Sequence, residues 1–337
     1  ELQQASVAKI RTNPYVISKI GRLTFLDADR IARSLRFPPD FRPRYRAAIL
    51  YYLDHHLKNH GDICVRRGQL IDDFSSGRFL SEHGSYPEEP IVGRQLVEEL
   101  LDELIEEGAI VQSRSRSGDC YLYTPEYFYI EENIIKGLQS LMRSQIPPFC
   151  SNDDIDRFIA KYEKERFPLA DKQKAAVYMA LNNRLSILTG GPGTGKTATT
   201  NVIVQFIHEH NPKARVKLLA PTGKAAKRLS EMTGYEAMTI HRGLGLRIFG
   251  KEKEIRTLDE DFVIVDEFSM TDAYLFNLLI NHVGDHTRLV LIGDYHQLPS
   301  VGPGLVLRDL IHSGRIPVTE LTEIFRQARE SQLVVNA

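Results

Sequence analysis

Three observations predict an α/β P-loop domain with a parallel sheet and helices on both faces, preceded by a mostly α-helical region. After Pro147-Pro148, short apolar runs alternate with helix-like segments. A Gly-rich turn joins one of these runs to a helix at residues 190–197. Before Pro147, apolar residues recur mainly at helical spacing. Strands that alternate with helices indicate a parallel sheet covered by helices.

The bulk properties indicate two or three domains without a membrane segment. The chain has 337 residues and no apolar run near the ~20 residues of a membrane span. Cys64, Cys120 and Cys150 lie far apart without metal-type spacing, so we expect reduced thiols in the cytoplasm and no membrane partner. Because the chain begins with Glu1 and stops at Ala337 inside a helix-like run, we interpret it as a segment of a longer protein.

Charge is distributed unevenly although the net charge is −1. Residues 1–46 hold ten Lys/Arg and four Asp/Glu, a balance of +6. Residues 72–108 hold two Arg and eleven Asp/Glu, a balance of −9. Such asymmetry predicts one surface that faces a polyanion and another that avoids it.

The N-terminal region predicts a helical pair followed by a winged-helix pattern. Apolar spacing over residues 13–35 indicates two short helices around a turn. The elements expected next are a helix over 44–60, a short strand over 62–65, a helix over 67–74, a loop-rich stretch over 77–90, an amphipathic helix over 92–107, and a hairpin of strands 109–112 and 120–123. Three helices followed by a two-stranded wing are typical of a winged-helix domain.

The third of these helices, residues 92–107, is acidic. Its carboxylates are Glu98, Glu99, Asp102, Glu103, Glu106 and Glu107. In a DNA-reading winged helix this helix would enter a groove, where phosphates would repel it. We therefore expect it to face a protein partner or to act as a scaffold. Arg114 and Arg116 at the wing tip have the charge to contact phosphate, but a solvated turn is the favoured interpretation.

Residues 190–197, Gly-Gly-Pro-Gly-Thr-Gly-Lys-Thr, predict a P-loop. An apolar strand over 185–189 precedes them and a helix over 198–210 follows, which is the context that this motif requires. Lys196 would reach the β- and γ-phosphates, and the Thr197 hydroxyl would coordinate Mg²⁺. The expected nucleotide-binding residues here are Gly191, Gly193, Thr194, Gly195, Lys196, Thr197 and Thr199.

Two further segments complete the predicted nucleotide site. The buried strand 262–265 ends at Asp266 and Glu267. Asp266 would hold Mg²⁺, and Glu267 would be the general base toward the attacking water. Gln297 follows the next apolar strand and has an amide able to sense a γ-phosphate. Arg326 adds a planar, bidentate donor for developing phosphoryl charge.

Together these motifs resemble the superfamily 1 DNA helicases of the RecD type. The resemblance covers about residues 168–330 and rests on six segments: Gly190–Thr197, Ala220–Ala226, Thr239–Arg242, Asp266–Met270, Gly293–Val301 and Ile324–Gln327. It implies a RecA-like ATPase domain in an ATP- and Mg²⁺-dependent helicase. It also implies 5′→3′ travel on single-stranded DNA, in recombination and repair.

The resemblance implies roles for single residues as well. Gln173 matches the glutamine that reads the adenine edge, and Arg326 matches the γ-phosphate arginine of the fourth motif. The implied catalytic set is Lys196, Glu267, Gln297 and Arg326. The implied DNA contacts are Pro221, Thr222, Gly223, Lys224, Thr239, His241 and Arg242. Residues 234–256 match a small hairpin insertion, for which a strand-separating role and a solvated loop both stay open.

Residues 13–32 resemble the helix-hairpin-helix of the longer RecD-like proteins. That motif uses glycines so that backbone N–H groups can approach a DNA phosphate. Arg22 and Thr24 stand at the two glycine positions here. We therefore expect a degenerate, structural hairpin rather than a phosphate clamp.

The predicted organisation has three parts: a degenerate helix-hairpin-helix at 1–40, a winged-helix-like domain with a linker helix at 41–146, and a first RecA-like domain at 147–337. Nothing after Arg326 supplies the second RecA-like domain of this family, so we expect this segment to bind nucleotide weakly and not to unwind DNA. The alternative is a nucleic-acid-binding or partner-docking module with a regulatory or vestigial P-loop.

Overall fold

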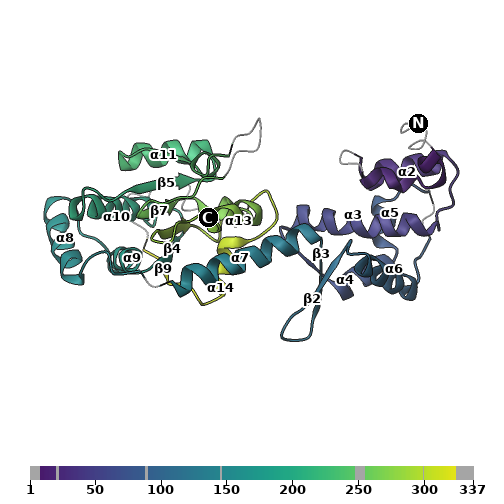
Figure 1. The fold of residues 1–337 in the computed structure, drawn as a ribbon, viewed down its shortest axis with the longest axis horizontal. Helices are drawn as coiled ribbons and strands as arrows, with labels where there is room; N and C mark the ends of the chain where they lie inside the picture. The colour runs from purple at the N-terminus through teal and green to yellow at the C-terminus, as the bar shows by residue number, and fades with distance from the viewer. Residues whose placement is uncertain are drawn as a thin grey trace. The chain divides into compact units, whose positions relative to one another are not determined.

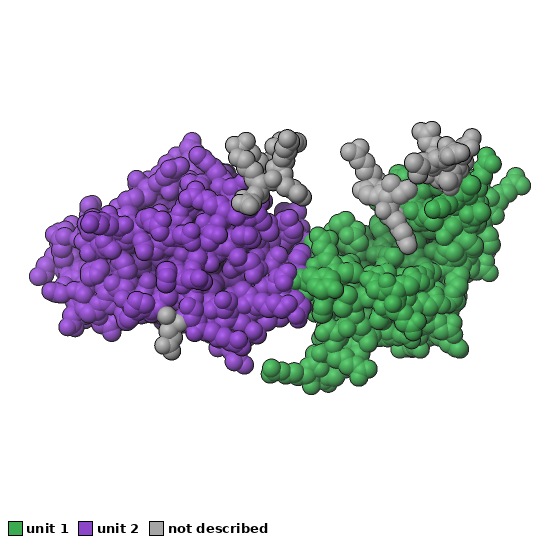
Figure 2. Space-filling model, in the orientation of Figure 1, with its two compact units in different colours: residues 1–129 green, residues 130–337 purple. Residues whose placement is uncertain are grey.

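The computed structural model of the chain (Figure 1) describes residues 8–19, 23–87, 90–144, 146–246, 255–298 and 300–323. The chain divides into two compact units, unit 1 with Glu1–Tyr129 and unit 2 with Ile130–Ala337 (Figure 2). The boundary that the sequence predicted after residue 146 therefore falls inside unit 2.

Unit 1 contains a helical pair followed by a winged-helix topology. Its elements are η1 (Pro14–Lys19), α2 (Phe25–Ser34), α3 (Arg42–His60), β1 (Val65–Arg66), α4 (Arg67–Ser75), α5 (Arg78–His83), α6 (Arg94–Glu106), β2 (Val111–Arg114) and β3 (Cys120–Tyr123). Both β1 and β2 pair with β3 in an antiparallel sheet of order β1-β3-β2. The short first strand therefore joins the predicted wing.

Helix α5 lies where the sequence predicted a loop over 77–90. Gly77 precedes the helix with a left-handed backbone (φ 71°). Phe79 and Leu80 of the helix are buried in the core of unit 1. Burial of these two large apolar side chains outweighs the local turn signal of glycine and serine.

Thr24 stands at one of the two positions where the helix-hairpin-helix motif has glycine, and it is the N-cap of α2. Its hydroxyl accepts a hydrogen bond from the Asp27 N–H (3.4 Å), and the Asp27 carboxylate accepts one from the Thr24 N–H (2.9 Å). This capping box satisfies backbone donors at the start of the helix. Thr24 therefore has a structural role, whereas Arg22 lies outside the described residues.

One hydrophobic core joins the parts of unit 1. Tyr15 and Phe25 of the helical pair share it with Leu53 of α3, Leu101 of α6 and Leu122 of β3. The two segments predicted as separate domains on either side of residue 40 therefore fold around the same core.

A buried ion pair between Asp29 and Arg44 holds several elements of unit 1 together. Arg44 donates to both carboxylate oxygens of Asp29, at 2.7 and 3.1 Å. The Tyr15 hydroxyl (2.6 Å) and the Ser85 N–H (2.9 Å) donate to the same carboxylate. Burial by itself raises the pKa of Asp29, but these donors outweigh it and hold the pKa below its ordinary value. The network links η1, α2, α3 and the segment after α5.

The acidic helix α6 is largely neutralised inside unit 1. Five of the six carboxylates over residues 92–107 form ion pairs: Glu98 with Arg94, Glu99 and Glu103 with Arg42, Asp102 with Arg67, and Glu103 and Glu107 with Arg46. These arginines belong to α3, α4 and α6 itself. The charge asymmetry of the sequence is therefore partly cancelled by contacts within the unit.

Unit 2 is built on a six-stranded parallel sheet. Helix α7 (Pro125–Arg143) leads into it, and the following elements are α8 (Asn152–Glu165), α9 (Asp171–Asn182), β4 (Leu185–Gly190), α10 (Lys196–His210), β5 (Val216–Ala220), α11 (Gly223–Thr233), β6 (Ala237–Thr239), α12 (Ile240–Gly243), β7 (Phe262–Val265), η2 (Phe268–Met270), α13 (Ala273–Ile280), β8 (Arg288–Gly293), α14 (Val306–His312) and β9 (Val318–Leu321). Each neighbouring pair is parallel, in the order β6-β5-β7-β8-β4-β9.

Helices cover both faces of this sheet. Phe262 and Ile264 of β7 belong to a core cluster with residues of α8, α9 and α10. The alternate residues Val263 and Val265 are also fully buried, which places them on the opposite face. Figure 1 shows α10 and α13 on opposite sides of the strands. Across the described ranges, no helix has the length and apolar composition needed to cross a membrane.

We expect Asp29→Asn to destabilise unit 1 by about 3–5 kcal/mol, because the Arg44 guanidinium would stay buried without its counter-charge. The pKa of Asp29 is lower in the folded chain than its ordinary value of 3.8. The wild-type contribution is therefore present above pH 3.8 and is lost as the pH falls through the lower folded value. Native-state hydrogen exchange of α3 amides measures the change. Asp40→Asn, at an exposed carboxylate, is the control, and an equal loss in both variants would contradict this assignment.

Candidate active site

A cavity of about 550 Å³ lies at the carboxyl ends of β4 and β7 in unit 2. It brings together nine residues predicted from the sequence: Gln173, Gly191, Gly193, Gly195, Lys196, Thr197, Asp266, Glu267 and Gln297. They come from four separate segments of the chain. In open α/β sheets, ligands bind at this edge, beyond the carboxyl ends of the strands.

The P-loop requires glycine where the backbone is left-handed and where another strand passes too close for a side chain. Gly193 (φ 77°) and Gly195 (φ 87°) have left-handed backbones, which side chains disfavour. At Gly190 a Cβ atom would lie 2.6 Å from the carbonyl oxygen of Leu321 in β9. Gly195 is also the N-cap of α10, so the positive end of that helix faces the cavity. The loop is thus shaped to bind phosphate through its backbone.

Lys196 is the first residue of α10, directly after the glycines of this loop. Its ammonium group donates hydrogen bonds to the carbonyls of Gly190 (2.5 Å) and Gly191 (3.0 Å). Burial lowers the pKa of Lys196, and the nearby carboxylates of Asp294 and Glu267 oppose that effect. The site therefore holds a cation in a partly desolvated position, where its attraction for phosphate is strengthened.

Asp266 and Glu267 follow β7 directly. Burial raises the pKa of Asp266 to about 6, and the charge of Glu267 acts in the same direction. The Asp266 carboxylate accepts a hydrogen bond from the Glu267 N–H at 2.9 Å. Glu267 has a left-handed backbone (φ 52°), a strained conformation for a residue other than glycine. Strain of this kind is typical of functional sites.

Two oxygen donors on the cavity fit a magnesium ion bound with a nucleotide. They are the Thr197 hydroxyl at the start of α10 and the Asp266 carboxylate at the end of β7. Mg²⁺ usually combines one or two protein ligands with substrate phosphates and water. The described residues contain no group of three or more acidic, His or Cys side chains that could hold a metal alone.

Thr194 and Thr199 do not line the cavity. The Thr194 hydroxyl donates to the Gly191 carbonyl (2.8 Å) and the Thr199 hydroxyl donates to the Gly195 carbonyl (3.0 Å). Both side chains are buried. They shape the loop and the first turn of α10 instead of presenting their hydroxyl groups to a ligand. Arg326 lies outside the described residues.

Gln173 is buried, and its side-chain carbonyl accepts the Ala170 N–H at 3.1 Å. This bond caps the start of α9 and fixes the orientation of the amide.

Four cavity residues were not predicted from the sequence as part of the site: Phe167, Ala198, Arg228 and Met232. Ala198 directly follows the P-loop motif. Phe167 precedes α9, and the other two lie four residues apart on α11. Residues at that spacing share a helix face. The helical pattern after Lys224 could therefore have indicated that Arg228 and Met232 lie on the same side of this helix.

The predicted DNA-contacting residues lie beside the cavity, after the neighbouring strands β5 and β6. Ala220 and Thr239 are paired in register where these strands end. The hydroxyl groups of Thr222 and Thr239 cap α11 and α12 by accepting backbone N–H groups at 3.2 Å. Lys224 is exposed, as are His241 and Arg242. In the insertion at 234–256, residues 247–254 lie outside the described residues.

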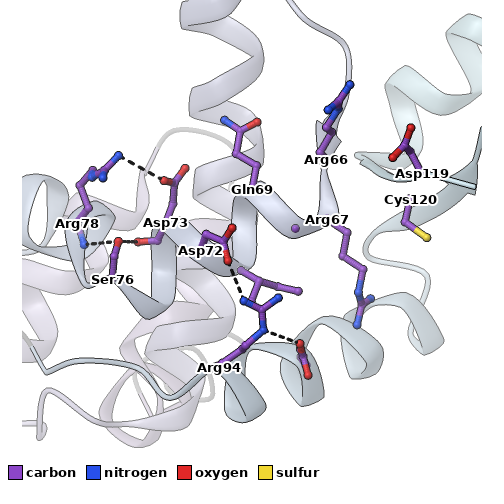
Figure 3. Close-up of a pocket in the computed structure, with 13 residues that line it drawn as sticks. Arg66, Arg67, Gln69, Asp72, Asp73, Ser76, Arg78, Arg94, Asp119 and Cys120 are labelled. Carbon is purple, nitrogen blue, oxygen red and sulfur yellow. Dashed lines mark hydrogen bonds and ion pairs between the residues drawn. The ribbon is translucent and has the colours of Figure 1, made fainter.

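A larger cleft, of about 930 Å³, lies in unit 1 between α4, α6 and the start of β3 (Figure 3). It is less suited to a nucleotide because three of its four arginines are paired with carboxylates, and the fourth, Arg66, lies over the Tyr121 ring. Arg94 contacts Asp72 at 2.8 Å, Arg67 contacts Asp102 at 2.9 Å, and Arg78 lies 3.8 Å from Asp73. The smaller cavity at the P-loop is therefore the better candidate for a nucleotide site than this larger cleft.

Comparisons with known proteins match both units. The family described as "ATP-dependent RecD2 DNA helicase HHH domain" matches residues 1–64, and the family described as "AAA domain" matches residues 173–303.

Similar proteins include the ATP-dependent RecD2 DNA helicase of Deinococcus radiodurans. It is 34% identical over 219 residues, which cover 65% of this chain and 30% of that protein. The RecBCD enzyme subunit RecD of Haemophilus influenzae is 35% identical over 213 residues, which cover 55% of this chain and 33% of that protein. The chain spans about a third of the length of these relatives.

Among solved structures, the Pif1 helicase from Candida albicans aligns with a TM-score of 0.37 and 25% identity, covering 50% of this chain and 42% of that one. The two family models match one segment in unit 1 and one in unit 2. Together with the relatives, they show that the chain is similar in sequence to RecD-like DNA helicases.

Proposed function

We propose that this chain binds and hydrolyses ATP as part of a motor that moves 5′→3′ along single-stranded DNA. The observation that carries the proposal is the single cavity that gathers the P-loop, Asp266, Glu267 and Gln297. These groups match the needs of phosphoryl transfer: a phosphate cradle, a metal ligand, a base and a γ-phosphate sensor.

Each residue has a distinct role in this proposal. Lys196 and the backbone N–H groups of the loop bind the phosphates, and Gln173 binds the base. Glu267 orients and deprotonates the attacking water, and Gln297 contacts the γ-phosphate. Mg²⁺, held by Thr197 and Asp266, would neutralise charge on the phosphates. Arg326 is proposed to add positive charge at the γ-phosphate.

The DNA strand is proposed to lie over the ends of β5 and β6. Lys224, His241 and Arg242 are exposed there and can contact phosphates or stack on bases. Because this surface adjoins the nucleotide cavity, binding at one site can act on the other. We expect the described units alone to bind nucleotide without unwinding DNA, since translocation needs two lobes that close and open.

For the acidic helix we propose a scaffold role. Five of the six carboxylates over residues 92–107 pair with arginines of unit 1, and most of these pairs hold α6 against α3 and α4. We also propose a cytoplasmic location, because Cys64, Cys120 and Cys150 form no disulfide.

Lys196→Ala in the full-length protein is expected to lower DNA-stimulated ATP hydrolysis at least a hundredfold, because the β- and γ-phosphates lose their cation. A coupled ATPase assay with and without single-stranded DNA measures the rate. Lys213→Ala, at an exposed lysine away from the cavity, is the control. An unchanged rate in Lys196→Ala would favour the alternative of a DNA-binding or docking module with a vestigial P-loop.

Lys224→Ala is expected to weaken single-stranded DNA binding and to reduce the slope of log affinity against log salt by about 1, because one phosphate contact is lost. Fluorescence anisotropy with a labelled oligonucleotide over a salt series measures both quantities. Lys227→Ala on the same helix is the control, since Lys227 pairs with Glu231. The same slope in Lys224→Ala and wild type would remove Lys224 from the DNA surface.

A further inference from the structure

Arg228 is a cation on the nucleotide cavity that none of the recognised motif roles uses. It lies in α11 and lines the cavity together with Lys196 and Asp266. Its side chain is exposed. Over the described ranges, no carboxylate forms an ion pair with Arg228, whereas the adjacent Lys227 lies 3.8 Å from Glu231.

The geometry of α11 places Arg228 at the cavity. Arg228 and Met232 lie four residues apart on this helix, and both line the cavity. Because residues at that spacing share a helix face, Arg228 lies on the face of α11 that borders the cavity.

The cavity also holds the carboxylates of Asp266 and Glu267, but among the described residues neither of them forms an ion pair with Lys196 or Arg228. Two cations on one cavity repel each other less when an anion binds between them. A nucleoside triphosphate carries several negative charges on adjacent phosphates and would satisfy both cations. Arginine is well suited to this task because its planar guanidinium can donate two parallel hydrogen bonds to a phosphate.

We propose that Arg228 is a phosphate-binding residue of the nucleotide site, a second cation that acts beside Lys196. The inference rests on the proposed function and deepens it. Arg228 shares the cavity with the P-loop and Asp266, and a guanidinium is suited to bind the phosphates of a nucleotide.

The helix that carries Arg228 also carries a predicted DNA contact. Lys224, in the first turn of α11, is one helical turn before Arg228. The two cations are thus held on one element but have different expected ligands, which makes their effects separable.

The test measures binding of a fluorescent, non-hydrolysable ATP analogue to the full-length protein. Arg228→Ala is expected to raise the Kd about tenfold, as for the loss of a charge-assisted hydrogen bond. Arg228→Lys should recover part of the affinity, because it keeps the charge but not the bidentate geometry. Lys227→Ala is the matched control and should bind as wild type does. If Arg228→Ala fails to fold, Arg228→Gln replaces it, since glutamine keeps a long, helix-compatible side chain.

The outcomes separate this inference from the proposed function. A Kd for Arg228→Ala or Arg228→Gln within twofold of the Lys227→Ala value would overturn the role of Arg228. Lys196→Ala in the same assay tests the site itself. If Lys196→Ala weakens binding and the Arg228 variants do not, only the inference about Arg228 fails. If neither weakens binding, the proposed nucleotide site fails as well.

Discussion

The parallel direction of the six strands in unit 2 is the constraint on which the candidate site depends. Because neighbouring strands run the same way, each one delivers its following loop to the same edge of the sheet. The P-loop after β4 and the Asp266-Glu267 pair after β7 therefore meet, although about seventy residues separate them in the chain. An antiparallel strand at either position would carry its loop to the opposite edge.

The same constraint explains how much could be predicted from the sequence. The four central strands and the nucleotide motifs are strongly apolar or rich in glycine, so local sequence identifies them. The strands β6 and β9 lie at the edges of the sheet and are only partly buried, which weakens their apolar signal. Arg228 could not be assigned from its neighbours, because only the packing of α11 brings it to the cavity.

Unit 1 shows that charge counted along a sequence differs from charge available at a surface. The positive balance of residues 1–46 includes Arg42, Arg44 and Arg46, and each of these is paired with a carboxylate of the same unit. The Asp29–Arg44 pair is fully buried, so it contributes to specificity of packing and offers nothing to a polyanion. Sequence patterns cannot reveal this, because the partners lie far apart in the chain.

The two carboxylates after β7 also have a consequence for protein engineering. Glu267 holds a strained backbone that costs on the order of 1–3 kcal/mol, and Asp266 is held where burial disfavours its charge. Glycine or asparagine in place of Glu267 would relieve the backbone strain, and asparagine in place of Asp266 would remove the buried charge. A directed-evolution campaign that selects for heat resistance alone would therefore tend to replace the two residues that we propose as metal ligand and general base. A screen for thermal tolerance of unit 2 therefore has to measure activity as well.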